Sequence, residues 1–165
     1  MISKGQKIPS VTIKQATAEG GVDVDPAALF AGKKVIMFSL PGAFTPTCSQ
    51  QHLPGYVQKL PELKAAGIDL VACLSVNDMF VMKAWAEQQD AIGKIVMLAD
   101  GSGAFTKALG IEFDLTARGL GVRANRGVFT IDNGTVTSVD MEAPGKFEVS
   151  SAEACLIGLK SAVHM

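Results

Sequence analysis

The chain has 165 residues and a formal net charge of -1, and hydrophobic residues make up 48% of it against 19% for charged residues. This length and hydrophobic share predict a single folded domain over residues 1–165 and exclude a natively disordered chain. The balanced charge argues against a nucleic-acid partner, and no apolar run approaches the ~18 residues that span a bilayer. We therefore expect partners other than nucleic acid or a membrane.

The small numbers of cysteines and histidines limit which cellular compartments and which metal sites are compatible with this chain. Three cysteines at scattered positions form no disulfide framework and favour a reducing, cytoplasmic compartment. Residues 1–7 include basic side chains but no apolar stretch follows them, so we expect no secretory signal. With two histidines and no Cys-x-x-Cys motif, a metal site would be short of ligands, and we expect no metal.

In chain order, short apolar runs alternate with segments typical of helices. Three runs are typical of strands buried on both faces of a parallel sheet: residues 34–40, 69–76 and 95–99. A helix is predicted at residues 46–65, with a kink near Pro54, which has no N–H for the helical ladder. A second helix, at residues 79–88, begins after Asn77 or Asp78, either of which can cap it.

The last third of the chain predicts a hairpin and a helix. An Asn-Gly pair separates the strand-like runs 127–132 and 135–140, and both of its residues tolerate positive φ. Ser150 and Glu153 have the spacing of a capping box that opens a C-terminal helix. The whole order predicts an α/β fold with a mixed central sheet and helices on both faces.

The most informative residue is Cys48, at the start of the first long helix. Proline is favoured at the first helical position, which makes Pro46 that position and Thr45 the cap before it. Cys48 then lies in the first turn, where unpaired N–H groups and the helix dipole favour a thiolate. The alternative, from these residues alone, is a cysteine that serves only as a small buried hydrophobe.

The pattern Pro41-x-x-x-Thr45-x-x-Cys48 resembles the active-site signature of the peroxiredoxins. The longer Pro-Gly-Ala-Phe-Thr-Pro-Thr-Cys-Ser, followed by His-Leu-Pro-Gly, is similar to the branch that contains the plant type II and human type V enzymes. The resemblance extends over nearly the whole chain, through residues 75–85, 98–103 and 119–123.

The resemblance implies a thioredoxin-like fold and a role for each matching residue. The Cys48 thiolate would attack the O–O bond of a peroxide, become a sulfenic acid and release water or an alcohol. Thr45 would contact the thiolate and the attacked oxygen, and Pro41 would shield the sulfur from water. The family's arginine precedes a strand that ends in an Asn-Gly or Asp-Gly turn, which favours Arg126, with Arg123 as the alternative.

How Cys48 is returned to the thiol stays open. Cys73 matches the second cysteine of the plant type II enzymes, but it lies in an apolar run, which favours core packing in the reduced state. Both roles are compatible if the fold opens locally after oxidation. Mammalian type V enzymes carry their resolving cysteine nearer to Ser150 than Cys155 lies, so no role is transferred to Cys155. The resemblance implies no cofactor, and glutaredoxin with glutathione, or else thioredoxin, as the external reductant.

Two further expectations concern neighbours of the motif. His52 lies on the same helix face as Cys48, and local hydrogen bonds are favoured over metal binding, because no second ligand is near in sequence. Phe44 and Phe80 occupy positions that the family uses for a homodimer contact, which predicts a symmetric dimer.

The predicted function is a thiol-dependent peroxidase that reduces hydrogen peroxide and alkyl hydroperoxides in antioxidant defence. A thioredoxin-type dithiol oxidoreductase is disfavoured, because Gln51 and Thr45 stand where a second cysteine would be needed. A peroxide sensor or redox relay would use the same chemistry at Cys48 and remains an alternative.

Overall fold

The computed structural model describes residues 1–163. Its strands are β1 (Ile13–Thr17), β2 (Gly20–Val24), β3 (Lys34–Ser39), β4 (Leu70–Ser75), β5 (Val96–Ala99), β6 (Glu112–Leu115), β7 (Gly121–Ala124), β8 (Gly127–Asp132) and β9 (Thr135–Met141). Its α-helices are α1 (Pro26–Leu29), α2 (Leu53–Ala65), α3 (Met79–Gln88), α4 (Ala104–Leu109) and α5 (Ala152–Val163). Two short turns complete the set, the π-helical η1 (Cys48–His52) and the 3-10 turn η2 (Thr116–Arg118).

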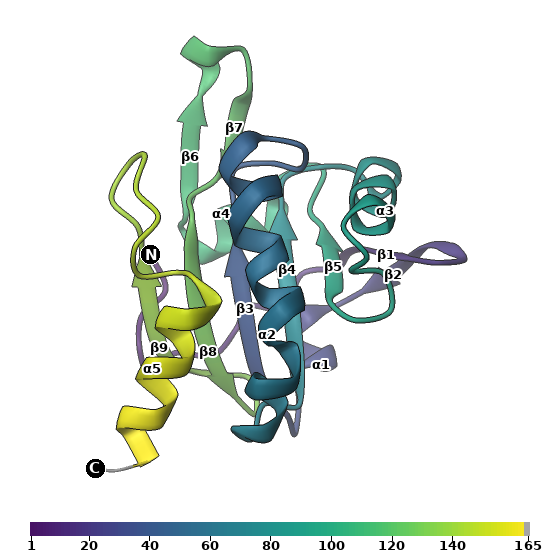
Figure 1. Cartoon of the computed structure of the whole chain (residues 1–165). Helices are drawn as coiled ribbons and strands as arrows, with labels where there is room; N and C mark the ends of the chain where they lie inside the picture. Colours follow the sequence, from purple (N-terminus) through teal and green to yellow (C-terminus); the bar gives the residue numbers. More distant parts are fainter. Residues whose placement is uncertain (164–165) are drawn as a thin grey trace.

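Seven strands form one sheet in the order β2-β1-β5-β4-β3-β8-β9 (Figure 1). Its centre is parallel, since β3 pairs with β4 and β4 with β5 in the same direction. The edges are antiparallel, with β1 added to β5 and β8 added to β3. The three apolar runs form this parallel centre, which confirms the predicted mixed α/β sheet.

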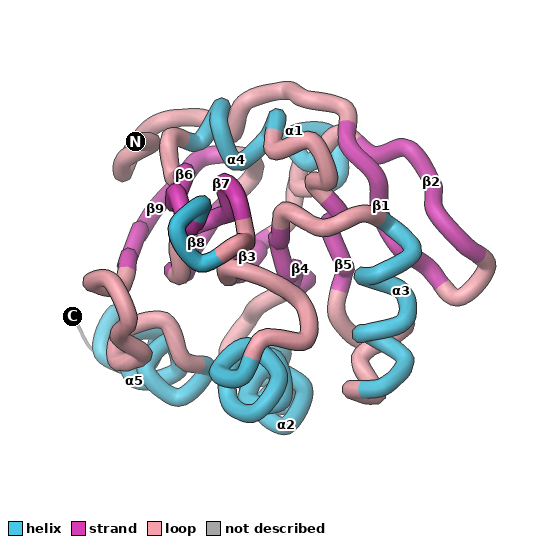
Figure 2. The backbone as a smooth tube through the Cα atoms, turned by 90° about the horizontal axis from the view of Figure 1, so that it is seen from above, coloured by secondary structure: helices cyan, strands magenta, loops and turns pink. Residues whose placement is uncertain are grey.

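Helices cover both faces of the sheet, as predicted. In Figure 2, α2 and α5 lie side by side below the sheet, and α1 and α4 lie above it. The core below the sheet also contains Trp85 and Met82 of α3, whereas the core above it contains Phe105 and Leu109 of α4. Within residues 1–163, none of the helices combines the length and apolar character needed to cross a membrane.

Side chains of β3 alternate between the two cores. Ile36 and Phe38 belong to the core below the sheet, and Val35 and Met37 to the core above it. This alternation follows from the two-residue period of a strand, and it explains why a strand buried on both faces is apolar throughout. The ring of Phe38 stacks on Tyr56 of α2 at 4.0 Å between centroids. This contact packs β3 against α2, the helix that follows η1.

The predicted hairpin is confirmed, and two others were missed. Asn133 and Gly134 adopt positive φ angles of 49° and 79° and join β8 to β9. The β1–β2 and β6–β7 pairs have largely exposed or half-buried residues in β2 and β6, so neither strand carries a strong apolar run. Figure 1 shows β6 and β7 extending beyond the main sheet, above the start of α2.

The prediction that Ser150 caps the last helix is wrong. The hydroxyl of Ser151, not that of Ser150, accepts the N–H of Ala154 in the first turn of α5. Ser150 donates its hydroxyl to Glu142 instead. The two adjacent serines offer the same local chemistry, and only the tertiary contact with Glu142 separates their roles.

Candidate active site

The turn after β3 places Cys48 at the start of a helix, as the sequence predicts. The carbonyl of Thr45 accepts the N–H of Ser49 at 2.9 Å, which is the first helical hydrogen bond, and the helix begins at Pro46. The hydroxyl of Thr45 does not cap the helix but donates to the carbonyl of Gly42 at 2.7 Å. The turn also holds Phe44 at a φ of 65°, which is uncommon for a residue other than glycine.

The helix widens at Cys48 into a π-helical turn. The N–H of Leu53 donates to the carbonyl of Cys48, five residues earlier, instead of the usual four. Pro54, directly after it, has no N–H to donate, so an α-helical ladder could not have continued through this position. The kink predicted near Pro54 is therefore a π turn, and such turns are frequent at functional sites.

Cys48 is fully buried and lies against an arginine. Arg126 donates from Nη2 to the Cys48 sulfur at 3.0 Å. The backbone before β8 is held by Ser39 at the end of β3, whose hydroxyl donates to the carbonyl of Asn125 at 2.7 Å. A guanidinium carries a positive charge and can only donate hydrogen bonds, so this contact directs positive charge at the sulfur.

His52 holds the other side of the same guanidinium. Arg126 donates from Nη1 to His52 Nδ1 at 2.7 Å, and His52 Nε2 donates to the carbonyl of Ser150 at 3.0 Å. Arginine can only donate and a carbonyl can only accept, so His52 must carry its proton on Nε2 alone. Burial, together with the charge of Arg126, lowers the pKa of His52 to about 3, against the opposing effect of the Ser150 carbonyl. His52 is therefore a neutral acceptor for Arg126.

The metal alternative for His52 gains no support. Among the residues that the structure describes, no three histidine, cysteine or carboxylate side chains lie close enough together to hold an ion. Both ring nitrogens of His52 have protein partners, as predicted, but these are Arg126 and Ser150, which lie 74 and 98 positions away and not in the local segment that the sequence favoured.

Arg123, the alternative arginine, points elsewhere. It donates from Nη1 to the carbonyl of Pro41 at 3.2 Å and from Nε to the carbonyl of Leu120 at 2.8 Å. Arg123 therefore stabilises the turn before Cys48, whereas Arg126 is the arginine that contacts the Cys48 sulfur.

A loop between β9 and α5 closes over the His52–Arg126 pair. The ring of Phe147 packs edge-on against His52 at 5.1 Å between centroids and lies 5.8 Å from the Arg126 guanidinium carbon. The loop is tied down by Glu142, which accepts hydrogen bonds from residues 148–150. No motif in the sequence indicated this part of the site, because its residues lie 16 or more positions beyond Arg126 and 94 or more beyond Cys48.

A cavity of about 440 Å³ opens beside Arg126. Its wall includes residues of the Cys48 turn and apolar residues of the β6–β7 hairpin and the segment between these strands: Pro41, Thr45, Phe113, Leu115, Leu120 and Arg126. Arg126 lies in the wall of this cavity, whereas Cys48 is fully buried and does not line it.

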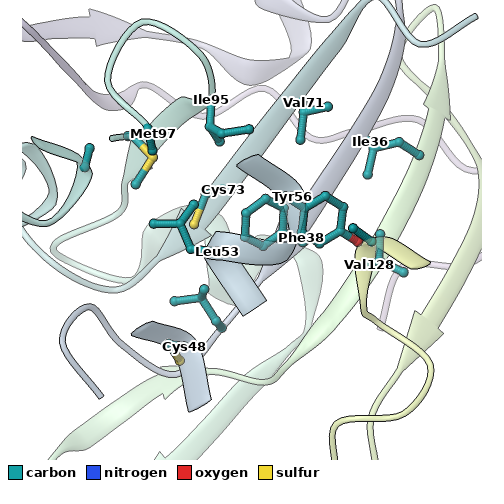
Figure 3. Packing of buried hydrophobic residues seen from close by; sticks show 14 of the residues in the cluster. Ile36, Phe38, Cys48, Leu53, Tyr56, Val71, Cys73, Ile95, Met97 and Val128 are labelled. Carbon is teal, nitrogen blue, oxygen red and sulfur yellow. The ribbon is translucent and has the colours of Figure 1, made fainter. Parts of the chain in front are cut away.

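The other two cysteines are also buried. Cys73 lies in β4 with no exposed surface, opposite Phe38 in the register of the sheet, and Figure 3 shows it in the same buried cluster as Cys48. Burial raises the pKa of the Cys73 thiol well above its usual value, and the charge of Cys48 adds to this effect. Burial also raises the pKa of Cys155, in α5, to about 11. Both thiols therefore stay protonated at neutral pH in this state.

The only tryptophan of the chain lies next to the active-site turn. Trp85 of α3 donates from Nε1 to the hydroxyl of Ser49 at 3.0 Å. The residue that follows Cys48 is thus joined to the neighbouring helix by its side chain.

A buried cysteine at a helix start, paired with an arginine in an α/β fold, defines a protein of thiol redox chemistry. The comparisons specify the class. A family model described as Redoxin matches residues 3–156. Peroxiredoxin-2C of Arabidopsis thaliana is 46% identical over 159 residues, which cover 96% of this chain and 98% of that protein. Peroxiredoxin-2E, chloroplastic, of the same plant is 46% identical over 162 residues, covering 96% of this chain and 69% of that protein.

Solved structures give the same result. Reduced Prx3 from Vibrio vulnificus in complex with hydrogen peroxide is 55% identical and superposes with a TM-score of 0.92, covering 96% of this chain and 99% of that chain. Oxidised Prx3 of the same organism, with the same identity and coverage, has a TM-score of 0.87. The chain belongs to the peroxiredoxin family, in the branch of the plant type II enzymes. It has the thioredoxin-like fold of that family and is a thiol-dependent peroxidase.

The neutral state of His52 predicts a pH dependence of stability. Because its folded pKa, about 3, lies below its ordinary value of 6.5, His52 contributes stability that is fully present above pH 6.5. That contribution is lost as the pH falls from 6.5 toward 3. Urea unfolding of the wild type and of His52→Gln should therefore show a free-energy difference that shrinks over this range. A difference that stays constant between pH 7 and pH 4 would contradict the assignment.

Proposed function

We propose that Cys48 is the residue that attacks the peroxide and that Arg126 activates it. The observation that carries this proposal is the 3.0 Å contact from Arg126 Nη2 to the buried sulfur. None of the ion pairs in the described part of the chain involves Arg126, so no carboxylate competes for its charge. The full charge of the guanidinium is thus directed at the sulfur and at the reacting oxygens.

The reaction is a displacement at oxygen. The Cys48 thiolate forms an S–O bond with one peroxide oxygen as the O–O bond breaks, and the electron pair leaves with the other oxygen. Taking up a proton, the leaving oxygen becomes water or an alcohol, and Cys48 becomes a sulfenic acid. Negative charge moves from sulfur to the leaving oxygen, and donors fixed near both atoms lower the barrier.

Thr45 and Pro41 complete the proposed site. Thr45 lines the cavity, and its hydroxyl oxygen, whose hydrogen is donated to the carbonyl of Gly42, is left to accept a hydrogen bond from a peroxide O–H. Pro41, half-buried, lies in the same wall and limits the access of water to the sulfur. The apolar side chains of Phe113, Leu115 and Leu120 support alkyl hydroperoxides as substrates besides hydrogen peroxide, because they offer an apolar surface to a substrate tail.

For regeneration, we propose an external thiol, glutathione with glutaredoxin, and no resident cofactor. Burial and protonation of Cys73 make it a poor nucleophile in this state. The second route, a Cys48–Cys73 disulfide reduced by thioredoxin, requires local opening of the fold. The lower TM-score with the oxidised than with the reduced Prx3 of Vibrio vulnificus favours such a rearrangement on oxidation and keeps this route as the alternative.

We further propose a homodimer and a cytoplasmic location. Phe44, in the turn before Cys48, is 51% exposed, and Phe80, in the first turn of α3, is 73% exposed. The hydrogen bond from Ala43 N to Asn77 Oδ1 at 3.0 Å joins the segments that precede them. Large exposed aromatic side chains on neighbouring segments favour an interface. The location rests on the scattered, reduced cysteines alone, and the name of one relative places that protein in chloroplasts. A redox relay to partner proteins would use the same Cys48 chemistry and is the alternative function.

The attacking role is tested by substitution. Cys48→Ser is expected to abolish peroxide turnover, and Arg126→Gln to lower the second-order rate constant with hydrogen peroxide by about 10²-fold or more, since an aligned donor is lost. Arg123→Gln removes an equal charge that touches only backbone carbonyls, so its effect should be smaller. Stopped-flow kinetics with hydrogen peroxide measures all three variants. Retained turnover in Cys48→Ser would refute the proposal.

The reductant is tested on the oxidised protein. After one equivalent of peroxide and an excess of glutathione, mass spectrometry is expected to find glutathione on Cys48 and Cys73 still reduced. Cys73→Ser should keep most of its turnover with glutaredoxin and glutathione. A Cys48–Cys73 linkage as the main product, with turnover lost in Cys73→Ser, would establish the two-cysteine route instead.

The proposed dimer is tested by placing a charged side chain at Phe80. Phe80→Glu places a carboxylate in the proposed contact, where a symmetric interface would bring two like charges together. Analytical ultracentrifugation should find dimers for the wild type and monomers for this variant. Ile157→Glu, at an exposed apolar position in α5 (61% exposed against 73% for Phe80), serves as the control and should leave the dimer intact. A monomeric wild type would rule the interface out.

A further inference from the structure

Glu142 is a buried carboxylate that no basic side chain neutralises. It directly follows β9, only 5% of its surface is exposed, and none of the ion pairs in residues 1–163 includes it. Its Oε2 instead accepts the backbone N–H groups of Glu148, Val149 and Ser150 at 2.7, 2.9 and 2.9 Å, and the hydroxyl of Ser150 at 2.7 Å. Burial alone would raise the pKa of Glu142, but these hydrogen bonds bring it below its usual value. The carboxylate is therefore ionised and fixes the shape of the loop.

The loop that Glu142 fixes carries the anchor of His52. The carbonyl of Ser150 accepts hydrogen bonds from His52 Nε2 at 3.0 Å and from the hydroxyl of Tyr56 at 2.8 Å. The N–H and the hydroxyl of the same serine are held by the carboxylate, so its carbonyl has little freedom to move. Glu142 also donates its own N–H to the carbonyl of Arg126 at 2.9 Å.

We propose that Glu142 is a positioning residue for the peroxidase reaction. Its carboxylate fixes the Ser150 carbonyl, which orients His52 so that Arg126 keeps one N–H group on the Cys48 sulfur. This inference rests on the proposed function, because it concerns the same arginine and cysteine. Glu142 touches none of the reacting atoms, and it leaves the charge of Arg126 unpaired while restricting where that charge points.

The physical reason is the freedom of the arginine side chain. Arg126 borders an open cavity, into which its guanidinium could turn once His52 no longer holds it. Misplacing a donor by about 1 Å costs up to ~10²-fold in rate. A carboxylate that acts only through hydrogen bonds to a loop can thus affect the rate without approaching the substrate.

The test compares Glu142→Ala and Glu142→Gln in the full chain, at a temperature where circular dichroism shows every variant to be folded. Glu142→Ala should lower the second-order rate constant with hydrogen peroxide by about 10-fold or more. Glu142→Gln, which keeps an acceptor oxygen, should recover a large part of the rate.

Asp100 provides the matched control for a merely structural carboxylate. It is 2% exposed and accepts the backbone N–H groups of Phe105 and Thr106 at 3.2 and 2.7 Å, at the start of α4 on the other face of the sheet. Asp100→Ala should lower the free energy of unfolding and leave the rate of the folded protein unchanged. If Glu142→Ala behaves in the same way, with an unchanged rate constant for the folded protein, the proposal is wrong.

The route through His52 is tested by a double-mutant cycle. His52→Ala removes the link between the loop and Arg126, so adding Glu142→Ala should slow the reaction by clearly less than it does alone. Independent, multiplicative effects of the two substitutions would overturn the proposal. The result is separable from the fate of the proposed function: active Cys48→Ser would remove both, whereas inactive Cys48→Ser with an unaffected Glu142→Ala would remove only this inference.

Discussion

The contact between Arg126 Nη2 and the Cys48 sulfur is the interaction on which the arrangement of the site depends. Its two residues are 78 positions apart, and the sheet brings them together. β3 and β8 are antiparallel neighbours in which Ser39 pairs with Gly127, so the segment leaving β3 and the residue entering β8 meet at one edge. The turn after β3 then carries Cys48 into a helix start, and Arg126 precedes its strand by one residue.

The groups around this contact avoid competing for it. A second cation near Arg126 would repel it and a carboxylate bonded to it would weaken its pull on the sulfur. His52 does not repel Arg126, because burial and the charge of the arginine keep the imidazole neutral. It also does not compete with the sulfur for that charge, because an imidazole nitrogen accepts a hydrogen bond without a negative charge. The buried carboxylate of the loop, Glu142, accepts hydrogen bonds from N–H and O–H donors of its own loop.

The central sheet and the surroundings of Cys48 could be predicted from sequence because both are local patterns. Apolar runs define β3, β4 and β5, and the proline and threonine before Cys48 define a helix start over a few residues. The preference for Arg126 over Arg123 rests on the resemblance to the peroxiredoxins, whose arginine directly precedes such a strand, and the structure brings Arg126 to the sulfur. The catalytic roles of these residues stay predictions until kinetics tests them.

What the sequence could not predict depends on contacts between distant residues. β2 and β6 lack an apolar pattern because they lie at the surface, and no pattern around Glu142 distinguishes it from a solvated glutamate. Ser150 was assigned to a helix cap because its neighbours suit one, whereas in the fold it joins Glu142 to His52. The π turn was only partly foreseen, as a kink near Pro54, because the proline breaks the helical ladder without specifying how the chain adjusts.

The hydrogen bond from Trp85 to Ser49 gives the protein an optical signal of its own. Trp85 is the sole indole in the chain, and its N–H is bound to the residue adjacent to the reacting sulfur. Because Ser49 lies in the π turn, a rearrangement that displaces this residue on oxidation would lengthen or break that bond and change the polarity around the ring. Tryptophan fluorescence can therefore be used, without a label, to follow the oxidation and recovery of the turn around Cys48, and no second indole contributes to the signal.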